Sequence, residues 1–335
     1  MQPKHSIRPL PNPEECQGYP PSMMMDKPDC ELNFLLNVNN DNNSHHCLAC
    51  SFILRGETLD SINLMSGEHL LSNSINHIDK TKPVIIVCHG SFSWRNQMLI
   101  SNLASKLSIA MDVHTLRFDF TGNGHSTGEW KFGNLEQDYQ DLCSIVDFVH
   151  SLGCEVGCII GHSQGSASVL QCAARCATLE KQGLEIPCTK FVNLAGRYHS
   201  PSNDTSHKSF NQSHPLFDED DMSQLKDIGY FYLKNTYGEE RNDRFKITKE
   251  QVDKRTKRDT NQIMQHLQQS NTRIHILTIH GSKDEMVSVD NAYKFDRELA
   301  SGNHILHIIE GAGHNFNGIK YHSSMVDAIS SFVRK

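Results

Sequence analysis

Runs of apolar residues alternate with helical patterns through the middle of the chain. Residues 84–88 (Val-Ile-Ile-Val-Cys) form a continuous apolar run, which is typical of a strand buried on both faces of a parallel sheet. The alternation continues with helices expected at 97–109, 135–152 and 166–179 and strands at 113–120, 155–160 and 190–194. This order predicts an α/β fold with right-handed crossovers and a mostly parallel central sheet flanked by helices.

The alternation stops after residue 196 and resumes near residue 272. The intervening residues are polar, contain short apolar patches and show helical spacing over 251–269. Beyond them, strands are expected at 273–280 and 304–309 and helices at 289–299 and 321–333. We therefore predict one α/β core formed by 31–196 and 272–335, with 197–271 inserted as a cap, because such insertions cover sites at the carboxyl ends of strands.

The segments before residue 82 are less regular. Residues 1–30 are rich in proline and poor in periodic hydrophobicity, and we expect a disordered leader there. Two strand candidates follow at 32–38 and 48–55, separated by an asparagine-rich turn. The polar stretch 57–81 is expected to be a surface excursion.

Composition and charge exclude several classes of function. The formal net charge of −7 leaves no surplus of lysine and arginine to bind a phosphate backbone, so nucleic acid is not an expected partner. The longest basic stretch, 246–258, is interrupted by acidic residues and is expected to be a solvated helix face. No apolar run approaches the ~18 residues that cross a bilayer, so no integral membrane segment is expected.

The cysteine content bears on the cellular compartment. Eleven cysteines are an odd number, and they occur in a large chain without a recognisable export signal. This pattern predicts reduced thiols and a cytoplasmic protein. The sequence carries no signal for oligomeric state.

The strongest chemical motif is Gly161-His162-Ser163-Gln164-Gly165, which lies between a buried strand and a helix. A serine on such a tight strand-to-helix turn presents its hydroxyl at the edge of the sheet, and small flanking residues permit the turn. The three fixed positions alone also fit an ordinary serine in a glycine turn. The placement between strand and helix favours Ser163 as a nucleophile.

A serine nucleophile needs a general base and a carboxylate that orients the base. His314 lies in a glycine-rich loop directly after the last expected strand, and Asp284 directly follows the strand before it. Because the carboxyl ends of parallel strands share one edge of a sheet, we expect Ser163, Asp284 and His314 to meet there. Glu285 is the alternative acid, and an ordinary surface-loop role is the alternative for His314.

Acyl transfer also needs hydrogen-bond donors for the developing oxyanion. Gln164, the residue after the nucleophile, supplies one backbone N–H in this kind of turn, and we assign the second to Ser91 in the loop after strand 84–88. Phe92 and His162 are the expected substrate-pocket residues. A packing role in the core is an equally good interpretation of Phe92.

Two further patterns are weaker. The glycine-containing stretch 121–126 lacks the third glycine and the lysine of nucleotide-binding loops, so we expect a supporting loop and no cofactor. The sequence His45-His46-Cys47-x-x-Cys50 has no second pair with structural-zinc spacing downstream, so no metal is expected.

In their joint order these segments resemble the α/β-hydrolase superfamily, particularly its serine-aminopeptidase-like and cinnamoyl or feruloyl esterase-like members. The resemblance extends from residue 82 to the end and rests on 88–90, 117–126, 161–165, 192–198, 280–284 and 311–314. It implies an eight-stranded hydrolase sheet with a cap. It also implies catalysis by Ser163, Asp284 and His314, with oxyanion donors at Ser91 and Gln164.

The sequence thus predicts a serine hydrolase that cleaves small-molecule carboxylic esters through an acyl-enzyme on Ser163. Peptidase, thioesterase and monoacylglycerol-type lipase are alternatives within this class, because the cap sequence has no readable substrate code. The alternative from another class is a ligand-binding protein that uses a hydrolase scaffold without turnover.

Overall fold

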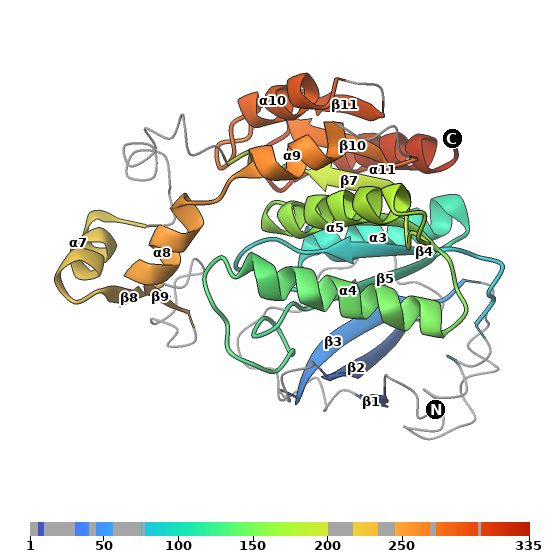
Figure 1. The fold of residues 1–335 in the computed structure, drawn as a ribbon, viewed down its shortest axis with the longest axis horizontal. Helices are drawn as coiled ribbons and strands as arrows, with labels where there is room; N and C mark the ends of the chain where they lie inside the picture. Colours follow the sequence, from blue (N-terminus) through green and yellow to red (C-terminus); the bar gives the residue numbers. More distant parts are fainter. Residues whose placement is uncertain are drawn as a thin grey trace.

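A nine-stranded sheet forms the centre of the computed structural model, which describes residues 6–9, 31–39, 45–55, 75, 78–199, 217–233, 245–268, 273–300 and 303–335 (Figure 1). In spatial order its strands are β1 (Ile7–Pro9), β2 (Glu31–Asn39), β3 (His45–Ile53), β5 (His114–Phe118), β4 (Val84–Cys88), β6 (Val156–His162), β7 (Lys190–Leu194), β10 (His275–Gly281) and β11 (His304–Ile309). From β5 to β11 all neighbours pair in parallel, whereas β1, β2 and β3 pair antiparallel. The predicted α/β class with a mostly parallel sheet is confirmed.

Strand β1 is a correction to the sequence prediction. The resemblance implies eight strands, and the sequence predicts a disordered leader over residues 1–30. Ile7–Pro9 instead pairs antiparallel with β2, with Ile7 opposite Leu36 and Pro9 opposite Phe34. A proline is tolerated here because β1 is an edge strand and needs no donor on its outer side. The remainder of the expected leader lies outside the described residues.

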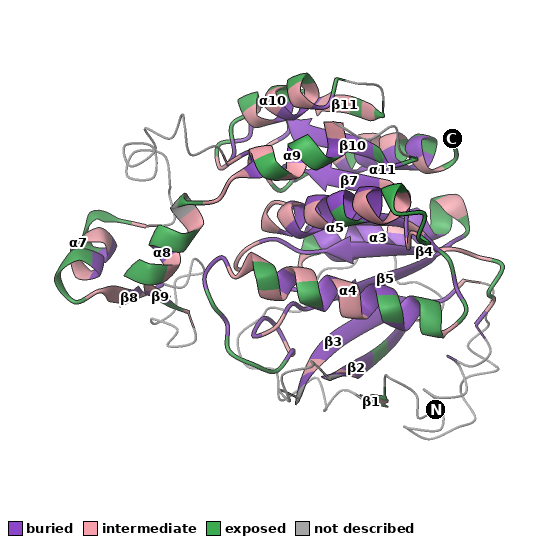
Figure 2. Ribbon diagram, viewed as in Figure 1, coloured by how far each residue is buried: buried purple, intermediate pink, exposed green. Residues whose placement is uncertain are grey.

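Helices cover both faces of the sheet. One face is packed against α3 (Met98–Met111) and α11 (Ile319–Val333), and the other against α4 (Leu135–Ser151), α5 (Gln164–Lys181), α9 (Thr260–Gln268) and α10 (Asp290–Glu298). The central strands are buried on both sides, as their continuous apolar runs predict (Figure 2). Residues 75 and 78 of the expected surface excursion are buried isoleucines that join the α4 side of the core.

A small unit projects beside the sheet and is called the cap unit below (Figure 1). It consists of α7 (Glu219–Asp227), β8 (Tyr230–Tyr232), β9 (Lys246–Thr248) and α8 (Lys249–Thr256). Its buried side chains form a separate apolar cluster that also takes in Trp130 and Phe132 from the loop before α4. The cap unit is therefore attached to the core by aromatic packing.

The carboxyl end of the expected cap differs from the prediction. The helical pattern over 251–269 forms two helices, α8 and α9, because the Asp259 side chain accepts a hydrogen bond from the Asn261 N–H and starts a new helix. Met264 and Leu267 of α9 pack in the main core against α5. This helix therefore belongs to the layer that covers the sheet.

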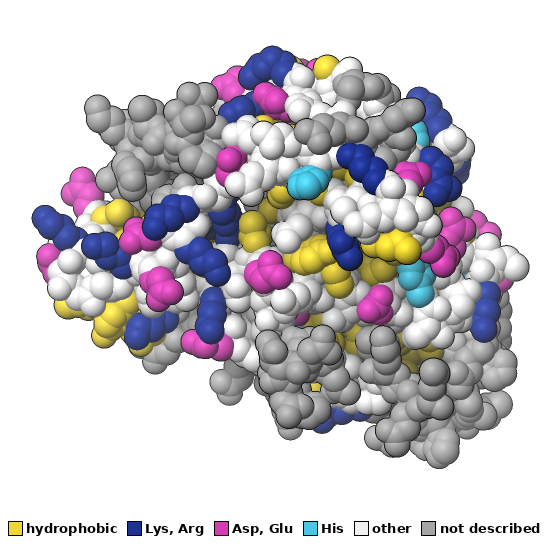
Figure 3. Space-filling model, in the orientation of Figure 1, with side chains coloured by type: hydrophobic (Ala, Val, Ile, Leu, Met, Phe, Trp, Pro, Cys, Tyr) yellow, Lys and Arg dark blue, Asp and Glu magenta, His cyan; other side chains and the backbone are white. Residues whose placement is uncertain are grey.

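The surface carries charges of both signs. On the face drawn in Figure 3, lysine and arginine side chains are interspersed with aspartate and glutamate. In the described parts of the chain, no helix combines the length and apolarity that a membrane span requires. The cysteines in these parts all carry free thiols.

Candidate active site

Ser163 stands on a strained turn between β6 and α5. Its backbone has φ 53° and ψ −116°, a conformation that non-glycine residues rarely adopt. The Ser163 N–H donates to the Leu194 carbonyl at 2.8 Å, which ties the turn to β7. A Cβ added to Gly165 would lie 2.5 Å from the His89 carbonyl oxygen, so the turn needs a glycine there. The sheet thus holds the Ser163 hydroxyl at its carboxyl edge.

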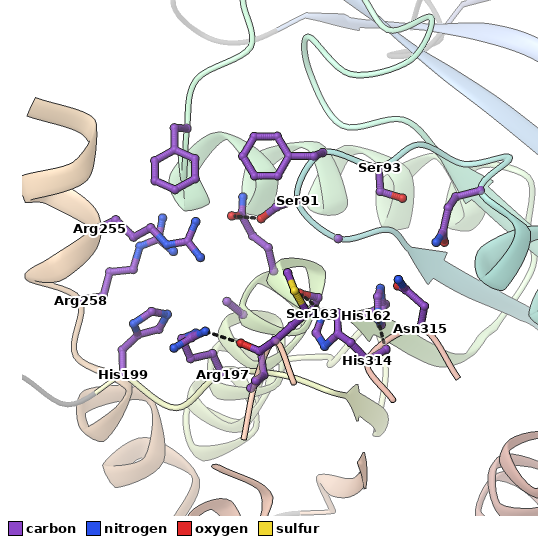
Figure 4. Close-up of a pocket in the computed structure, with 18 of the residues that line it drawn as sticks. Ser91, Ser93, His162, Ser163, Arg197, His199, Arg255, Arg258, His314 and Asn315 are labelled. Atoms are coloured by element: carbon purple, nitrogen blue, oxygen red, sulfur yellow. Dashed lines mark hydrogen bonds between the residues drawn. The ribbon is translucent and has the colours of Figure 1, made fainter. Parts of the chain in front are cut away.

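His314 and Asp284 converge on this serine. The His314 Nε2 atom lies 3.0 Å from the Ser163 Oγ atom (Figure 4). Its Nδ1 atom lies 2.8 Å from Asp284 Oδ2. The two side chains come from the loops after β11 and β10, as the sequence predicts. Glu285, the alternative acid, is exposed to solvent. The three residues therefore form one hydrogen-bonded line from carboxylate to hydroxyl.

Asp284 is buried and held in its charged form. Burial acts to raise its pKa, but hydrogen bonds from His280 and His314 and the backbone N–H of Val287 outweigh burial and hold the pKa well below its usual range. The Val287 N–H donates to Oδ1 at 2.8 Å, and the Met286 N–H donates to it at 2.9 Å. The carboxylate is thus fixed in orientation toward the imidazole.

The loop after β4 lies against the nucleophile. A Cβ added to Gly90 would approach the Ser163 Cβ atom to 3.0 Å. The Ser91 hydroxyl donates to the Gln164 side-chain oxygen at 2.7 Å, and the Gln164 amide donates to Asp138 at 2.8 Å. Both expected oxyanion donors, Ser91 and Gln164, thus belong to residues that line the cavity around Ser163.

His89 is a positioning residue that sequence reasoning missed. Its Nε2 atom accepts a hydrogen bond from the Phe120 N–H at 3.1 Å, so its Nδ1 carries the proton and donates to the Gly90 carbonyl at 2.8 Å. Burial lowers the pKa of His89 and keeps the ring neutral. Because a peptide unit is planar and trans, the Gly90 carbonyl fixed in this way also fixes the direction of the Ser91 N–H.

His162 lines the cavity beside Ser163 and also contacts His314. Its Nε2 atom donates to the His314 carbonyl at 3.0 Å, and the two rings are 4.9 Å apart. Burial, and then the neighbouring His314, lowers the pKa of His162 to about 3. A neutral His162 therefore holds the backbone of the loop that carries His314.

Phe92 lies between the cavity and a group of aromatic side chains. It lines the cavity of about 200 Å³ above Ser163. Its ring also packs on Trp130 at 5.4 Å, on Phe132 at 5.9 Å and on Phe245 at 6.1 Å between ring centres. Phe92 therefore joins the loop after β4 to the cap unit.

The loop at residues 121–126 is held against the loop after β4 by hydrogen bonds to Asp119. Asp119 is fully buried and accepts hydrogen bonds from the Arg95 N–H at 2.6 Å, from the Arg95 guanidinium and from the His125 N–H at 3.0 Å. Gly124 lies directly against the Asp119 carboxylate. These contacts tie the loop after β5 to the loop after β4.

The possible zinc ligands of residues 45–50 lie in β3. His46 Nε2 lies 3.2 Å from Asp141 Oδ1, and the Cys47 thiol donates to Asn37 at 2.9 Å. Cys50 is buried in the core. Among the residues placed by the structure, no group of three or more histidine, cysteine, aspartate or glutamate side chains is arranged to hold a metal ion.

Solved structures share this fold at low sequence identity. Est1E from Butyrivibrio proteoclasticus with bound ferulic acid is 18% identical, covers 86% of this chain and 95% of its own, and has a TM-score of 0.58. The esterase domain of a Rhodothermus marinus protein is 16% identical, with coverages of 91% and 97% and a TM-score of 0.55. Alpha/beta hydrolase domain-containing protein 10 from mouse is 17% identical, with coverages of 90% and 98% and a TM-score of 0.55.

The sequence itself matches a family model. The model of the alpha/beta hydrolase family matches residues 85–322, which include Ser163, Asp284 and His314. No curated protein sequence matches the chain. The superfamily resemblance of the motifs is confirmed by this match and by the shared fold. The chain belongs to the alpha/beta hydrolase family.

Proposed function

We propose that this hydrolase cleaves carboxylic esters through an acyl-enzyme on Ser163. His314 Nε2, which is 3.0 Å from the Ser163 Oγ, takes the hydroxyl proton as the oxygen attacks the acyl carbon. The backbone N–H groups of Ser91 and Gln164 stabilise the oxyanion. His314 then gives the proton to the leaving oxygen, and a water molecule that the same imidazole deprotonates releases the acid.

The observation that carries this proposal is the line of hydrogen bonds from Asp284 through His314 to Ser163. The distances of 2.8 Å and 3.0 Å are within the reach that proton transfer needs. Because Asp284 stays charged, it holds the proton of His314 on Nδ1 and leaves Nε2 free to accept. The ester class is supported by similar structures whose names include the word esterase.

A fluorophosphonate probe tests the nucleophile. We expect stoichiometric labelling of the native protein, no labelling of Ser163→Ala, and strongly slowed labelling of His314→Ala. Ser93→Ala is the matched control, because Ser93 lines the same cavity and its hydroxyl has no hydrogen-bond partner among the described residues. A native protein that folds and remains unlabelled contradicts the proposal and supports the ligand-binding alternative.

A substrate panel separates ester cleavage from the related activities. Each acyl group is offered as a 4-nitrophenyl ester, a thioester and an anilide, and kcat/KM is compared within each set. We expect the esters to be cleaved fastest. Faster cleavage of the anilides or thioesters assigns the chain to a peptidase or thioesterase class instead.

A further inference from the structure

Three arginines line the cavity above Ser163: Arg197, Arg255 and Arg258. No aspartate or glutamate occurs among the described residues that line it. Figure 4 shows Arg255 and Arg258 grouped with His199 on the cap side of the cavity, facing the side that holds Ser163 and His314. This concentration of positive charge contrasts with the formal net charge of −7 for the whole chain.

The Arg255 and Arg258 side chains are oriented, within the described residues, by groups that carry no negative charge. Arg258 donates to the Gly133 carbonyl, and the Arg255 guanidinium lies 4.5 Å from the centre of the Phe132 ring. Arg197 donates to the Met286 carbonyl at 2.8 Å. Within the described residues, neither Arg255 nor Arg258 forms an ion pair with a carboxylate. The contacts of Arg255 and Arg258 with Phe132 and Gly133 aim these two guanidinium groups without neutralising them.

Holding these cations together has an electrostatic cost. Burial, and then the charges of Arg258 and Arg197, lowers the pKa of Arg255 well below its ordinary value. Burial lowers the pKa of Arg258 to about 10, and Asp138 opposes this effect only partly. Like charges that lie close in a partly dry cavity repel each other until an anion enters. The three arginines therefore favour a negatively charged occupant of the cavity.

We propose that Arg255 and Arg258, assisted by Arg197, form an anion subsite, so that the substrate is an ester whose acyl or alcohol part carries a carboxylate or phosphate group. The planar guanidinium group binds such anions through paired hydrogen bonds. The subsite shares its cavity with the Ser163 hydroxyl, so an anion held there would position the scissile bond. This substrate class rests on the proposed ester hydrolase function.

Matched ester pairs test the subsite. The first pair is the 4-nitrophenyl monoester of glutarate and the neutral 4-nitrophenyl pentanoate, with the charge on the acyl side. The second is 4-acetoxybenzoate and neutral 4-acetoxybenzamide, with the charge on the alcohol side. We expect the anionic ester to have the higher kcat/KM in at least one pair. In that pair Arg255→Gln lowers the anionic-to-neutral ratio by about tenfold, the loss typical of one charged hydrogen bond.

Lys254→Gln is the matched control, because it removes the same charge from an exposed position of the same helix. It should leave the ratio unchanged. For the wild-type protein, the anionic-to-neutral ratio of kcat/KM should also fall as salt is added, because salt screens the arginine charges. This measurement needs no variant. The proposal is overturned if the neutral ester is preferred in both pairs, or if Arg255→Gln changes the ratio no more than Lys254→Gln does.

A binding measurement separates this proposal from the hydrolase function. Calorimetry on Ser163→Ala with monomethyl glutarate and with inorganic phosphate requires no turnover and identifies which anion the subsite takes. The subsite is supported if Ser163→Ala binds either anion and the double variant Ser163→Ala/Arg255→Gln does not. This result supports the subsite even if the native protein fails to react with a fluorophosphonate. Absence of binding of both anions overturns it.

Discussion

Asp138 should make the stability of this protein depend on pH in the neutral range. Burial, and to a smaller extent the charge of Asp141, raises its pKa from 3.8 to about 7, although the Gln164 amide and Arg258 favour the charged form. Because its carboxyl pKa is raised in the folded state, Asp138 binds its proton more tightly there than in the unfolded chain. The stability that this proton binding contributes is fully present below the unfolded pKa of 3.8. It is lost as the pH rises to the folded pKa of about 7. Between about pH 5 and pH 8 the expected loss is about 2–3 kcal/mol.

Asp138→Asn isolates this effect, since the amide oxygen can still accept from Gln164 and cannot ionise. Urea unfolding of the two proteins at both pH values gives the difference in unfolding free energy, and the variant should gain about 2–3 kcal/mol relative to wild type at the higher pH. Asp147→Asn is the control, because Asp147 is exposed on the same helix. An equal pH dependence of wild type and Asp138→Asn would refute the assignment.

Three further changes test the site. Asp284→Asn should lower kcat by about 10³–10⁴-fold without unfolding the protein, because the imidazole loses its orienting charge; steady-state kinetics with an unchanged melting temperature checks this. Gly165→Ala places a Cβ 2.5 Å from the His89 carbonyl and should destabilise by about 1–3 kcal/mol, so an unchanged melting temperature would count against the packing argument. Arg95→Met leaves the buried carboxylate of Asp119 without its cation and should lower the unfolding free energy by about 3–5 kcal/mol in urea.

The sequence predicts the candidate site best where its residues directly follow buried strands. Buried parallel strands are recognisable as apolar runs, and the residues directly after them share one edge of the sheet. For that reason the sequence alone predicts that Ser163, Asp284 and His314 lie close together. Their catalytic roles stay a prediction, as does the cytoplasmic location.

Contacts between distant segments could not be read in the same way. The His89 ring forms hydrogen bonds with the Phe120 N–H and the Gly90 carbonyl. Both partners are backbone groups, so the pattern of side chains along the sequence does not indicate them. Arg255 and Arg258 belong to the basic stretch 246–258, whose interruption by acidic residues predicts a solvated helix face. The structure instead places both in the lining of the cavity, because the cap unit packs on the aromatic side chains of the core. That placement depends on tertiary packing, which local hydrophobic periodicity does not encode.

The short strand β1 has a consequence for how this protein is handled. Without it, the whole outer side of the nine-residue strand β2 would offer unpaired backbone groups to other molecules. Exposed strand edges promote association between chains, because their unpaired backbone groups can pair with a strand of another chain. The three-residue strand β1 covers part of the outer edge of β2. Because β1 is short and ends in proline, it exposes few unpaired backbone groups of its own. A truncation placed at residue 30 on the basis of proline content would remove this cover. The shortened protein should aggregate more readily even though every residue of the candidate active site is retained.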